Sequence, residues 1–275
     1  MGRARTWAAA LALLSLAALP VALGGEPAQE RSSSWWSWRS WADDLFGSSF
    51  GGVSYGSGGP DRIAGSDRLV HEVRAVSGVR GIELSGPIDL VIKQDANEKL
   101  TLHTDDNIAP LIETKVQEGI LRVGVRPGAN FRTRHAIGVT VALAQLGALK
   151  VLGPGDVSCD GLDSDLLDIT MGGSGEVRID SMHAAATKVL LQGSGAVHLS
   201  GTSARQDYVI DGSGEVDADE LVGRAVAVRV AGSGKARIWA TESLSVDISG
   251  SGDVHYRGRP ALSSSLHGSG HLVHD

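Results

Sequence analysis

The sequence of 275 residues has little of what several classes of protein depend on. It contains one cysteine, eight prolines, three phenylalanines and three tyrosines. A single cysteine excludes a disulfide framework and a cysteine-rich zinc site. The formal net charge of −7 argues against nucleic acid and against an anionic membrane surface as partners.

Glycine, by contrast, is abundant. The 37 glycines make up about 13% of the chain, roughly twice the usual ~7%. Hydrophobic residues still account for 42%, so the chain is not an unstructured polar polymer. This combination predicts many tight turns between buried strands. At ~150 residues per domain, the length allows one large domain or two small ones.

Residues 1–24 have the features of an export signal. Arg3 and Arg5 precede a stretch rich in alanine and leucine, and small residues follow at Ala22 and Gly24. This order predicts a secretory signal peptide, and the apolar run is short for the ~20 residues of a membrane span. We therefore expect an exported protein in the periplasm, in the outer envelope or at the cell surface.

Residues 25–66 form a leader rich in tryptophan, glycine and serine. The stretch 47–59 has the composition of a flexible linker. Indole is apolar with one polar N–H, which suits a membrane interface or a sugar face. A disordered leader and a cap on the following domain are the alternatives. The residues predicted to dock on a partner, either a lipid interface or the N-terminal end of the domain, are Trp35, Trp36, Trp38 and Trp41.

A pentapeptide of the form Gly-x-Gly-x-apolar recurs seven times between residues 153 and 272. A fixed period near 20 residues over this many copies is typical of a solenoid. A sharp turn at the same place in every coil requires a positive φ or a close backbone approach, which explains the glycines. The predicted turn residues are Gly153, Gly155, Gly173, Gly175, Gly193, Gly195, Gly212, Gly214, Gly232, Gly234, Gly250, Gly252, Gly268 and Gly270.

Apolar residues alternate with polar ones on both sides of each glycine pair. They stand four and two residues before the first glycine and four and six after it, as in Val189, Leu191, Val197 and Leu199. Period-two alternation predicts two short strands per coil with one face inward. Stacked coils then form a right-handed parallel β-helix of about 20 residues per coil. An antiparallel sandwich is the competing fold, but it would not require a constant period.

Residues 67–145 alternate similarly without the strict pentapeptide, and we expect them to be the atypical, capping half, followed by regular repeats over 146–275. The block 76–86, the segment 106–114 and the serial Gly-Ser-Gly-acid-Val repeats resemble the bacterial GIN-domain family, labelled a "putative auto-transporter adhesin" head. The resemblance covers about residues 67–275. It implies an exported, β-helical, non-enzymatic domain of unknown molecular function.

Candidate sites for chemistry are sparse. Asp156 and Glu176 follow successive Gly-x-Gly turns and are candidate calcium ligands, but Ala196 and Lys235 interrupt the acidic series. We predict no catalytic residues and no cofactor, and expect Cys159 to be a buried apolar residue. His198 and His255 share a predicted outward column but stand three coils apart. His267, His271 and His274 cluster at the C-terminus, where capping of the open end is expected and metal binding is the alternative.

The sequence therefore predicts an exported binding or structural module rather than an enzyme. A regular solenoid presents repetitive faces to an extended glycan or protein partner. The alternative is a polysaccharide-acting enzyme, because parallel β-helices include such enzymes. The near-constant spacing of the repeats leaves no room for the long loops of a catalytic cleft. We expect a monomer that binds no nucleic acid.

Overall fold

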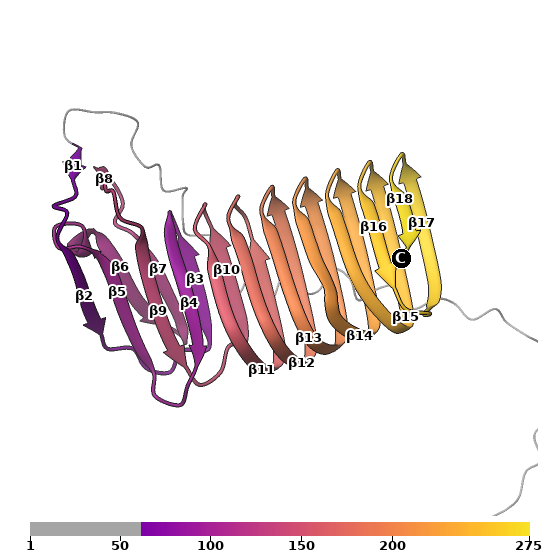
Figure 1. Cartoon of the computed structure of the whole chain (residues 1–275), viewed down its shortest axis with the longest axis horizontal. Helices are drawn as coiled ribbons and strands as arrows, with labels where there is room; N and C mark the ends of the chain where they lie inside the picture. Colours follow the sequence, from indigo (N-terminus) through magenta and orange to yellow (C-terminus); the bar gives the residue numbers. More distant parts are fainter. Residues whose placement is uncertain (1–61) are drawn as a thin grey trace, which may run out of the picture. The chain divides into compact units, whose positions relative to one another are not determined.

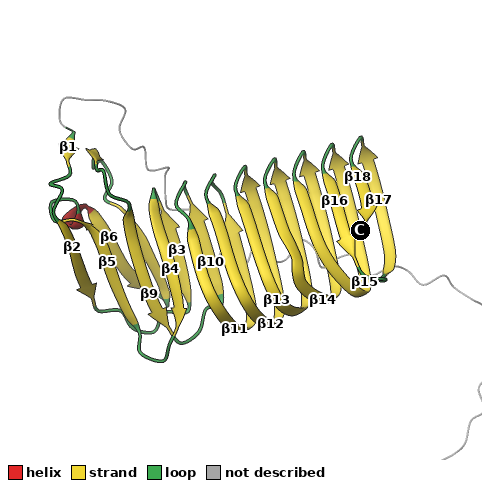
Figure 2. Ribbon diagram, in the orientation of Figure 1, coloured by secondary structure: helices red, strands yellow, loops and turns green. Residues whose placement is uncertain are grey.

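The computed structural model describes residues 62–275, and these form a parallel β-helix (Figures 1 and 2). The predicted fold class is confirmed. One short 3-10 helix, η1 (Ala109–Leu111), interrupts the strands. The N-terminal strands are β1 (Ile63–Ala64), β2 (Leu69–Arg74), β3 (Gly81–Ser85), β4 (Ile88–Gln94), β5 (Lys99–Asp105), β6 (Ile112–Gln117), β7 (Ile120–Val125), β8 (Phe131–Arg132) and β9 (Ile137–Leu143). The remaining strands are β10 (Ala148–Leu152), β11 (Val157–Met171), β12 (Glu176–Gly193), β13 (Ala196–Gly212), β14 (Glu215–Gly232), β15 (Lys235–Gly250), β16 (Asp253–Arg257), β17 (Ala261–Gly268) and β18 (His271–His274).

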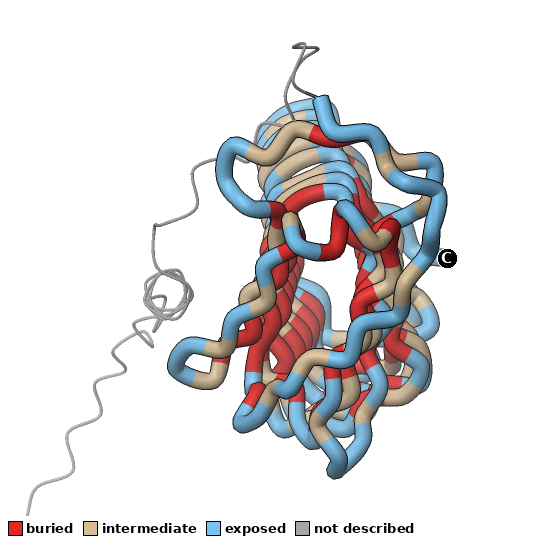
Figure 3. The backbone as a smooth tube through the Cα atoms, turned by 90° about the vertical axis from the view of Figure 1, so that its left-hand side faces the viewer, coloured by how far each residue is buried: buried red, intermediate tan, exposed pale blue. Residues whose placement is uncertain are grey.

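The coils are flattened, so the β-helix has two walls. In each of β11 to β15, the chain runs along one wall, bends, and returns along the other to the next Gly-x-Gly corner. We call the segments after each corner the post-corner wall and those before it the pre-corner wall. The view along the coils shows buried residues of the two walls facing each other (Figure 3). Between the walls lie the predicted inward residues, buried in every coil from Val151 to Val254.

The coils stay in register at the corners and lose it at the opposite bends. Gly212 pairs with Gly193 on one side and with Gly232 on the other. All register shifts between β12 and β15 lie near the bends, as between Ala218 and Val222. A one-residue slip would turn a whole strand inside out. Differences in repeat length are therefore absorbed at the bend, away from the aligned apolar columns.

Two effects explain glycine at the corners. Gly212 has a φ of 142°, a region that side chains rarely adopt. A Cβ on Gly212 would also lie 2.6 Å from the carbonyl oxygen of Gly193, one coil away. Gly214 has no positive φ, yet a Cβ there would lie 2.6 Å from the Gly195 oxygen. At this corner, the first glycine is required both for its backbone conformation and for the close approach of the neighbouring coil, whereas the second is required for close approach alone.

The N-terminal half stacks its coils out of sequence order. β3 pairs in parallel with β10 on one side and with β7 on the other, while β4 pairs with β11 and with β9. The coil made by β3 and β4 therefore lies between the β7–β9 coil and the regular repeats (Figure 1). Antiparallel strands lie at this end, with β2 on β5, β5 on β9, and β6 on β7.

The last coil differs from the expectation of a buried column. Ser264, Leu266 and His274 stand at inward positions, yet all three are exposed, Leu266 by 46%. The reason is that no described residue stacks beyond β17 and β18, so one side of this coil stays open. Cys159, in contrast, is buried as predicted, and burial raises the pKa of its thiol to about 11.

Candidate binding surfaces

The outer surface of the post-corner wall carries an array of ion pairs. Arg237 contacts Asp217 at 2.9 Å and Glu215 at 3.1 Å. Arg178 contacts Glu176 at 2.7 Å, and His198 lies 3.8 Å from Glu176. These contacts involve one outward position that recurs on every coil. The residues at this position are Ser158, Arg178, His198, Asp217, Arg237 and His255.

Three acids that follow a corner, Asp89, Asp156 and Asp253, accept a hydrogen bond from a backbone amide of the following coil. The amides opposite Glu176 and Glu215 donate instead to the carbonyl oxygens of Gly175 and Gly214. The amide of Asp156 donates to Oδ1 of Asp89 at 3.1 Å, and the amide of Glu176 donates to Oδ1 of Asp156 at 2.8 Å. The amide of His271 donates to Oδ1 of Asp253 in the same way, at 3.2 Å. These bonds give the three aspartates a structural role, and Glu176 takes part only through its own amide. No group of three or more potential metal ligands occurs within residues 62–275.

The outer surface of the pre-corner wall is less charged. Thr170, Leu190 and Val209 stand side by side on successive coils and point away from the core columns. Asp168, two residues before Thr170, is 1% exposed, and neither of its carboxylate oxygens has a hydrogen-bond partner among the described residues. Burial raises the pKa of Asp168 to about 6, while Lys188 partly opposes the shift. The two walls thus offer different chemistry to a partner.

A cavity of about 230 Å³ lies on the outer side of the pre-corner wall, over β3, β6 and β7. Glu83 is the buried charge of this cavity, with 2% exposure. The nearest ion-pair contact is Arg122 Nε, 3.8 Å from Glu83 Oε2, beyond hydrogen-bond distance. Burial raises the pKa of Glu83, and Lys150 and Arg122 oppose the shift. The lining residues are Glu83, Ser85, Glu113, Lys115, Gln117, Arg122, Val123, Gly124 and Val125.

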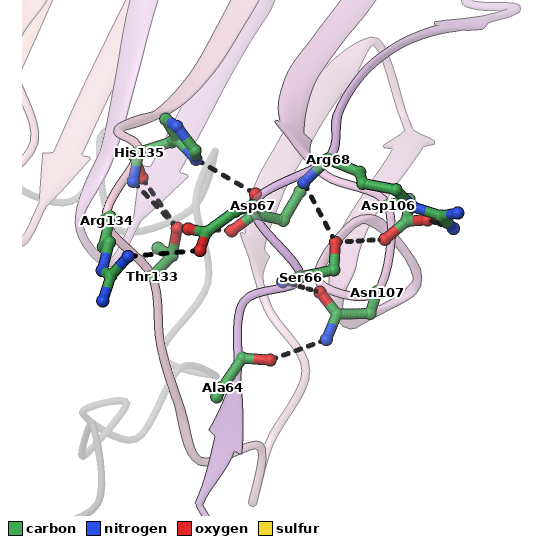
Figure 4. A network of polar contacts seen from close by, with 10 residues as sticks. Ala64, Ser66, Asp67, Arg68, Asp106, Asn107, Thr133, Arg134 and His135 are labelled. Carbon is green, nitrogen blue, oxygen red and sulfur yellow. Dashed lines mark hydrogen bonds and ion pairs between the residues drawn. The ribbon is translucent and has the colours of Figure 1, made fainter.

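A polar network ties the first described residues to the N-terminal end of the coils (Figure 4). Asp105 is fully buried and accepts a hydrogen bond from Thr133 Oγ1 at 2.7 Å, with His135 Nδ1 at 3.1 Å. Asn107 bridges Ala64 and Ser66 through hydrogen bonds of 2.7 and 3.0 Å. Both hydrogen-bonding partners of this buried carboxyl, Thr133 and His135, come from the loop after β8, so the network ties that loop to the end of β5.

Each histidine noted in the sequence contacts a non-histidine residue, and no three of them form a potential metal site within the described part of the chain. His198 lies between Glu176 and Asp217, His271 contacts Asp253, and His274 stacks on the ring of Tyr256. His255 contacts Asp275 and His267 contacts Ser265. Sequence reasoning did not single out His71 and His103, whose Nδ1 atoms lie 2.5 Å apart on β2 and β5. Only the antiparallel register of these strands brings that pair together.

Sequence reasoning also missed Glu83. The signal available was a lone acid within the apolar segment 81–85. The other residues that line the cavity come mostly from β6 and β7, about 30 to 40 positions later in the chain, so spacing could not reveal the cavity. The predicted signal peptide at 1–24 and Trp35, Trp36, Trp38 and Trp41 lie outside the described residues. Among residues 62–275, no helix is long and apolar enough to cross a membrane.

Comparison with known families gives one match. The family described as "Putative auto-transporter adhesin, head GIN domain" matches residues 79–260, which is about two thirds of the chain. The resemblance inferred from the sequence is thereby confirmed. Among proteins with curated functions, none matches this chain.

Solved structures share the fold. A "putative adhesin" from Bacteroides fragilis has 27% sequence identity and a TM-score of 0.72, covering 78% of this chain and all of its own. A "putative lipid binding protein" from Parabacteroides distasonis has 23% identity and a TM-score of 0.68, covering 78% of this chain and 99% of its own. A "putative adhesin" from Parabacteroides merdae has 22% identity and a TM-score of 0.62, with the same coverage. The two less similar structures support the fold alone.

Proposed function

Because this chain belongs to the family described as "Putative auto-transporter adhesin, head GIN domain", we propose that it is an exported, non-enzymatic binding module of the cell envelope or surface. Its partner is an extended glycan or protein that lies along the stacked coils. Stacked coils repeat the same side-chain positions at about 4.8 Å, the distance between neighbouring strands. Such a surface is suited to a polymer whose own groups repeat.

The observation that carries the proposal is the array on the post-corner wall. Arg178, His198, Asp217 and Arg237 occupy equivalent positions on successive coils. Their side chains are half-buried or exposed, and their ion pairs hold them in fixed orientations. Planar charged groups fixed in this way can form hydrogen bonds with hydroxyl, amide or carboxylate groups. The rigid backbone beneath reduces the entropy lost on binding.

A retention experiment tests the proposal. The exported chain is passed over immobilised polysaccharides of varied charge and over envelope proteins, and both retention and new reducing ends are measured. We expect retention by at least one polymer, without cleavage. The double variant Arg178→Ser/Arg237→Ser should lose at least about tenfold in affinity, because hydrogen bonds of charged groups contribute about 1.5–3 kcal/mol each.

The matched control is the double variant Lys188→Ser/Arg229→Ser. It removes two cations from the pre-corner wall, so it changes the net charge by the same amount. If both double variants lost the same affinity for the polymer, the loss would follow from the change in net charge. That result would contradict a binding surface on the post-corner wall. Cleavage of a polysaccharide would overturn the non-enzymatic assignment in favour of a polysaccharide-acting enzyme.

The cellular location is part of the same proposal. Export by residues 1–24 is supported by the family description, and fractionation of cells carrying a tagged full-length chain tests it. We expect the tag in the periplasm, the outer envelope or the medium. Its recovery in the cytoplasm would contradict an envelope role. Deletion of residues 26–60 in the same cells tests whether the tryptophan-rich leader binds lipid, since release from the membrane fraction is then expected.

A further inference from the structure

We propose that the cavity at Glu83 binds one neutral saccharide unit, through hydrogen bonds from two sugar hydroxyls to the Glu83 carboxylate. This site is distinct from the binding surface proposed above, because it lies on the opposite wall and in the irregular half of the β-helix. Its ligand is small, whereas the post-corner array takes a polymer.

The unsatisfied Glu83 carboxylate is the first argument. The side chain is 2% exposed, and neither Oε1 nor Oε2 has a hydrogen-bond partner within the described residues. A buried charged group without hydrogen bonds is costly, and native structures rarely keep one without a reason. Arg122 and Lys150 lower this cost through charge, yet neither donates a hydrogen bond to Glu83. The carboxylate therefore lacks donors, and the cavity beside it has room for a ligand that supplies them.

The charges around the cavity select the class of ligand. Glu83 and Glu113 line it together with Lys115 and Arg122, and Lys150 acts on Glu83 from the neighbouring strand β10, so charges of both signs surround the cavity. For a ligand of either charge, attraction to the groups of opposite sign is offset by repulsion from the groups of like sign. A net charge therefore gains little here, while the charged group still loses its hydration. A neutral molecule rich in hydroxyls avoids that loss. Adjacent hydroxyls can donate two hydrogen bonds to one carboxylate, which accepts through both oxygens.

The remaining lining residues complement the same ligand. The Ser85 hydroxyl donates to the Val123 carbonyl oxygen at 3.4 Å and can still accept a hydrogen bond. Gln117 contributes an amide whose oxygen already accepts from Arg122 Nη1 at 3.1 Å. These groups can form hydrogen bonds with the other sugar oxygens. Gly124 faces Ser85 so closely that a Cβ there would lie 2.3 Å from the Ser85 oxygen. A side chain at this position would thus displace the hydroxyl from the cavity wall.

The size of the cavity limits the ligand to one unit. Its volume of about 230 Å³ is below the roughly 300–1,000 Å³ of pockets for drug-sized molecules. A single sugar ring, or the end of a longer chain, is the largest ligand to expect. Affinity for one such unit should be weak, in the millimolar range, because few atoms contribute.

Amide chemical shifts provide the test. The ¹⁵N-labelled chain is titrated to tens of millimolar with neutral hexoses and disaccharides, and separately with an amino sugar and a sugar acid. We expect saturable shifts at Ser85 and Gly124 with a neutral sugar and at least about tenfold weaker binding of the charged ones. Saturable shifts confined to other residues, or none with any sugar, would overturn the proposal, as would tighter binding of a charged sugar.

Variants separate ligand binding from folding. Glu83→Gln keeps the shape and replaces one acceptor by a donor, so we expect binding to weaken at least about tenfold. Asp247→Asn is the control, since Asp247 stands in the same outward column at the far end of the wall. Should Glu83→Gln not fold, Gln117→Ala provides the second variant, because Gln117 is exposed and lines the cavity. Undiminished binding in both variants would contradict the site.

The outcome for this cavity is independent of the polymer proposal. Loss of small-sugar shifts in Glu83→Gln with polymer retention intact would support two separate surfaces. Polymer retention without any small-sugar shift would overturn the cavity ligand and leave the proposed function standing. Small-sugar binding without polymer retention would support the cavity ligand and overturn the proposed function.

Discussion

The two halves of the β-helix build the same kind of coil in different ways. From β10 to β18, each coil follows the previous one in sequence and pairs with it in parallel. From β2 to β9, the coil of β3 and β4 is flanked by strands that come much later in the chain, and three strand pairs are antiparallel. The regular half uses the same parallel pairing from one coil to the next, whereas the irregular half forms an end of the stack.

The ends of the stack show what this difference achieves. At the irregular end, β6 and β2 lie beyond the parallel coils, and loops carrying the Asp105 network lie beside them. At the regular end, β17 and β18 leave inward positions such as Leu266 exposed. Irregular strands can fold back over the apolar edge of the stack and cover it. An additional regular coil covers the edge beneath it but leaves its own apolar edge exposed. The cavity at Glu83 also lies where the repeat breaks down.

A charge placed inside the regular half should have the largest effect. Val197 is fully buried between Val177 and Val216 of the neighbouring coils. Val197→Asp should lower the free energy of unfolding by more than about 4 kcal/mol, because an unpaired carboxylate is buried on both sides. Thr202→Asp, at an exposed position of the same strand, should cost less than about 0.5 kcal/mol. Urea denaturation followed by circular dichroism measures both, and similar costs would contradict the assignment of inward positions.

Alanine substitutions at two equivalent inward positions, one inside the stack and one on the last coil, compare the interior with the open end. Ile248 is fully buried, whereas Leu266 stands one coil further on and is 46% exposed. Ile248→Ala should cost about 2–5 kcal/mol, and Leu266→Ala less than about 1 kcal/mol, since only the first leaves a cavity. Thermal unfolding measures the difference. An equally large cost at Leu266 would mean that the last coil is covered in solution.

Two glycines distinguish close approach from backbone conformation. Gly212 needs both a positive φ and room beside Gly193, while Gly128 has a φ of 79° and no atom within 4 Å of a Cβ position. Gly128→Ala should cost about 1–2 kcal/mol, the conformational penalty alone. Gly212→Ala should cost at least about 1 kcal/mol more, because two coils must move apart. Chemical denaturation of both variants checks this, and equal costs would show that the corners tolerate a methyl group.

The junction of the halves offers a pH test. Asp168, which pairs with Ala148 of β10, has a pKa near 6, above the roughly 3.9 of an unfolded chain. Its contribution to stability is present below about pH 4 and is lost as the pH rises through 6, because ionisation is then unfavourable only in the folded state. At pH 8, the free energy of unfolding of the Asp168→Asn variant should therefore exceed that of the wild type by about 1–3 kcal/mol. Near pH 4, the variant and the wild type should have equal free energies of unfolding, as measured by urea denaturation. A difference in stability that stays constant from pH 4 to pH 8 would contradict the raised pKa.

The ion-pair array of the regular half should contribute least to stability. Arg237 is 46% exposed although it contacts both Glu215 and Asp217. Arg237→Gln should cost less than about 1 kcal/mol, and still less in 1 M salt, because solvent and ions screen exposed charges. Thermal unfolding at low and high salt measures this. A larger, salt-independent cost would mean that the array serves folding rather than binding.

Sequence reasoning succeeded where structure repeats locally. Val197 and Leu199 could be placed inward because strand alternation and a period near 20 leave few other arrangements. It was less successful at the end of the repeat, where Leu266 has the right position but no covering coil. It could not place the segment 81–94 in the stack, since strand order depends on pairings between residues far apart in the chain. The cavity was missed for the same reason, because Glu83 and Arg122 meet only across β3 and β7.

The sequence by itself determined the coil: its length, its glycine corners and the residues that point inward. Each of these follows from steric effects over a few bonds and from apolar residues that recur at a fixed spacing. Only the tertiary structure decided which strands close one end, which coil lies between which neighbours, and where a buried carboxylate is left without hydrogen bonds. These features depend on contacts between distant segments, whose pairing is selected by the burial of the whole sheet and not by any local pattern.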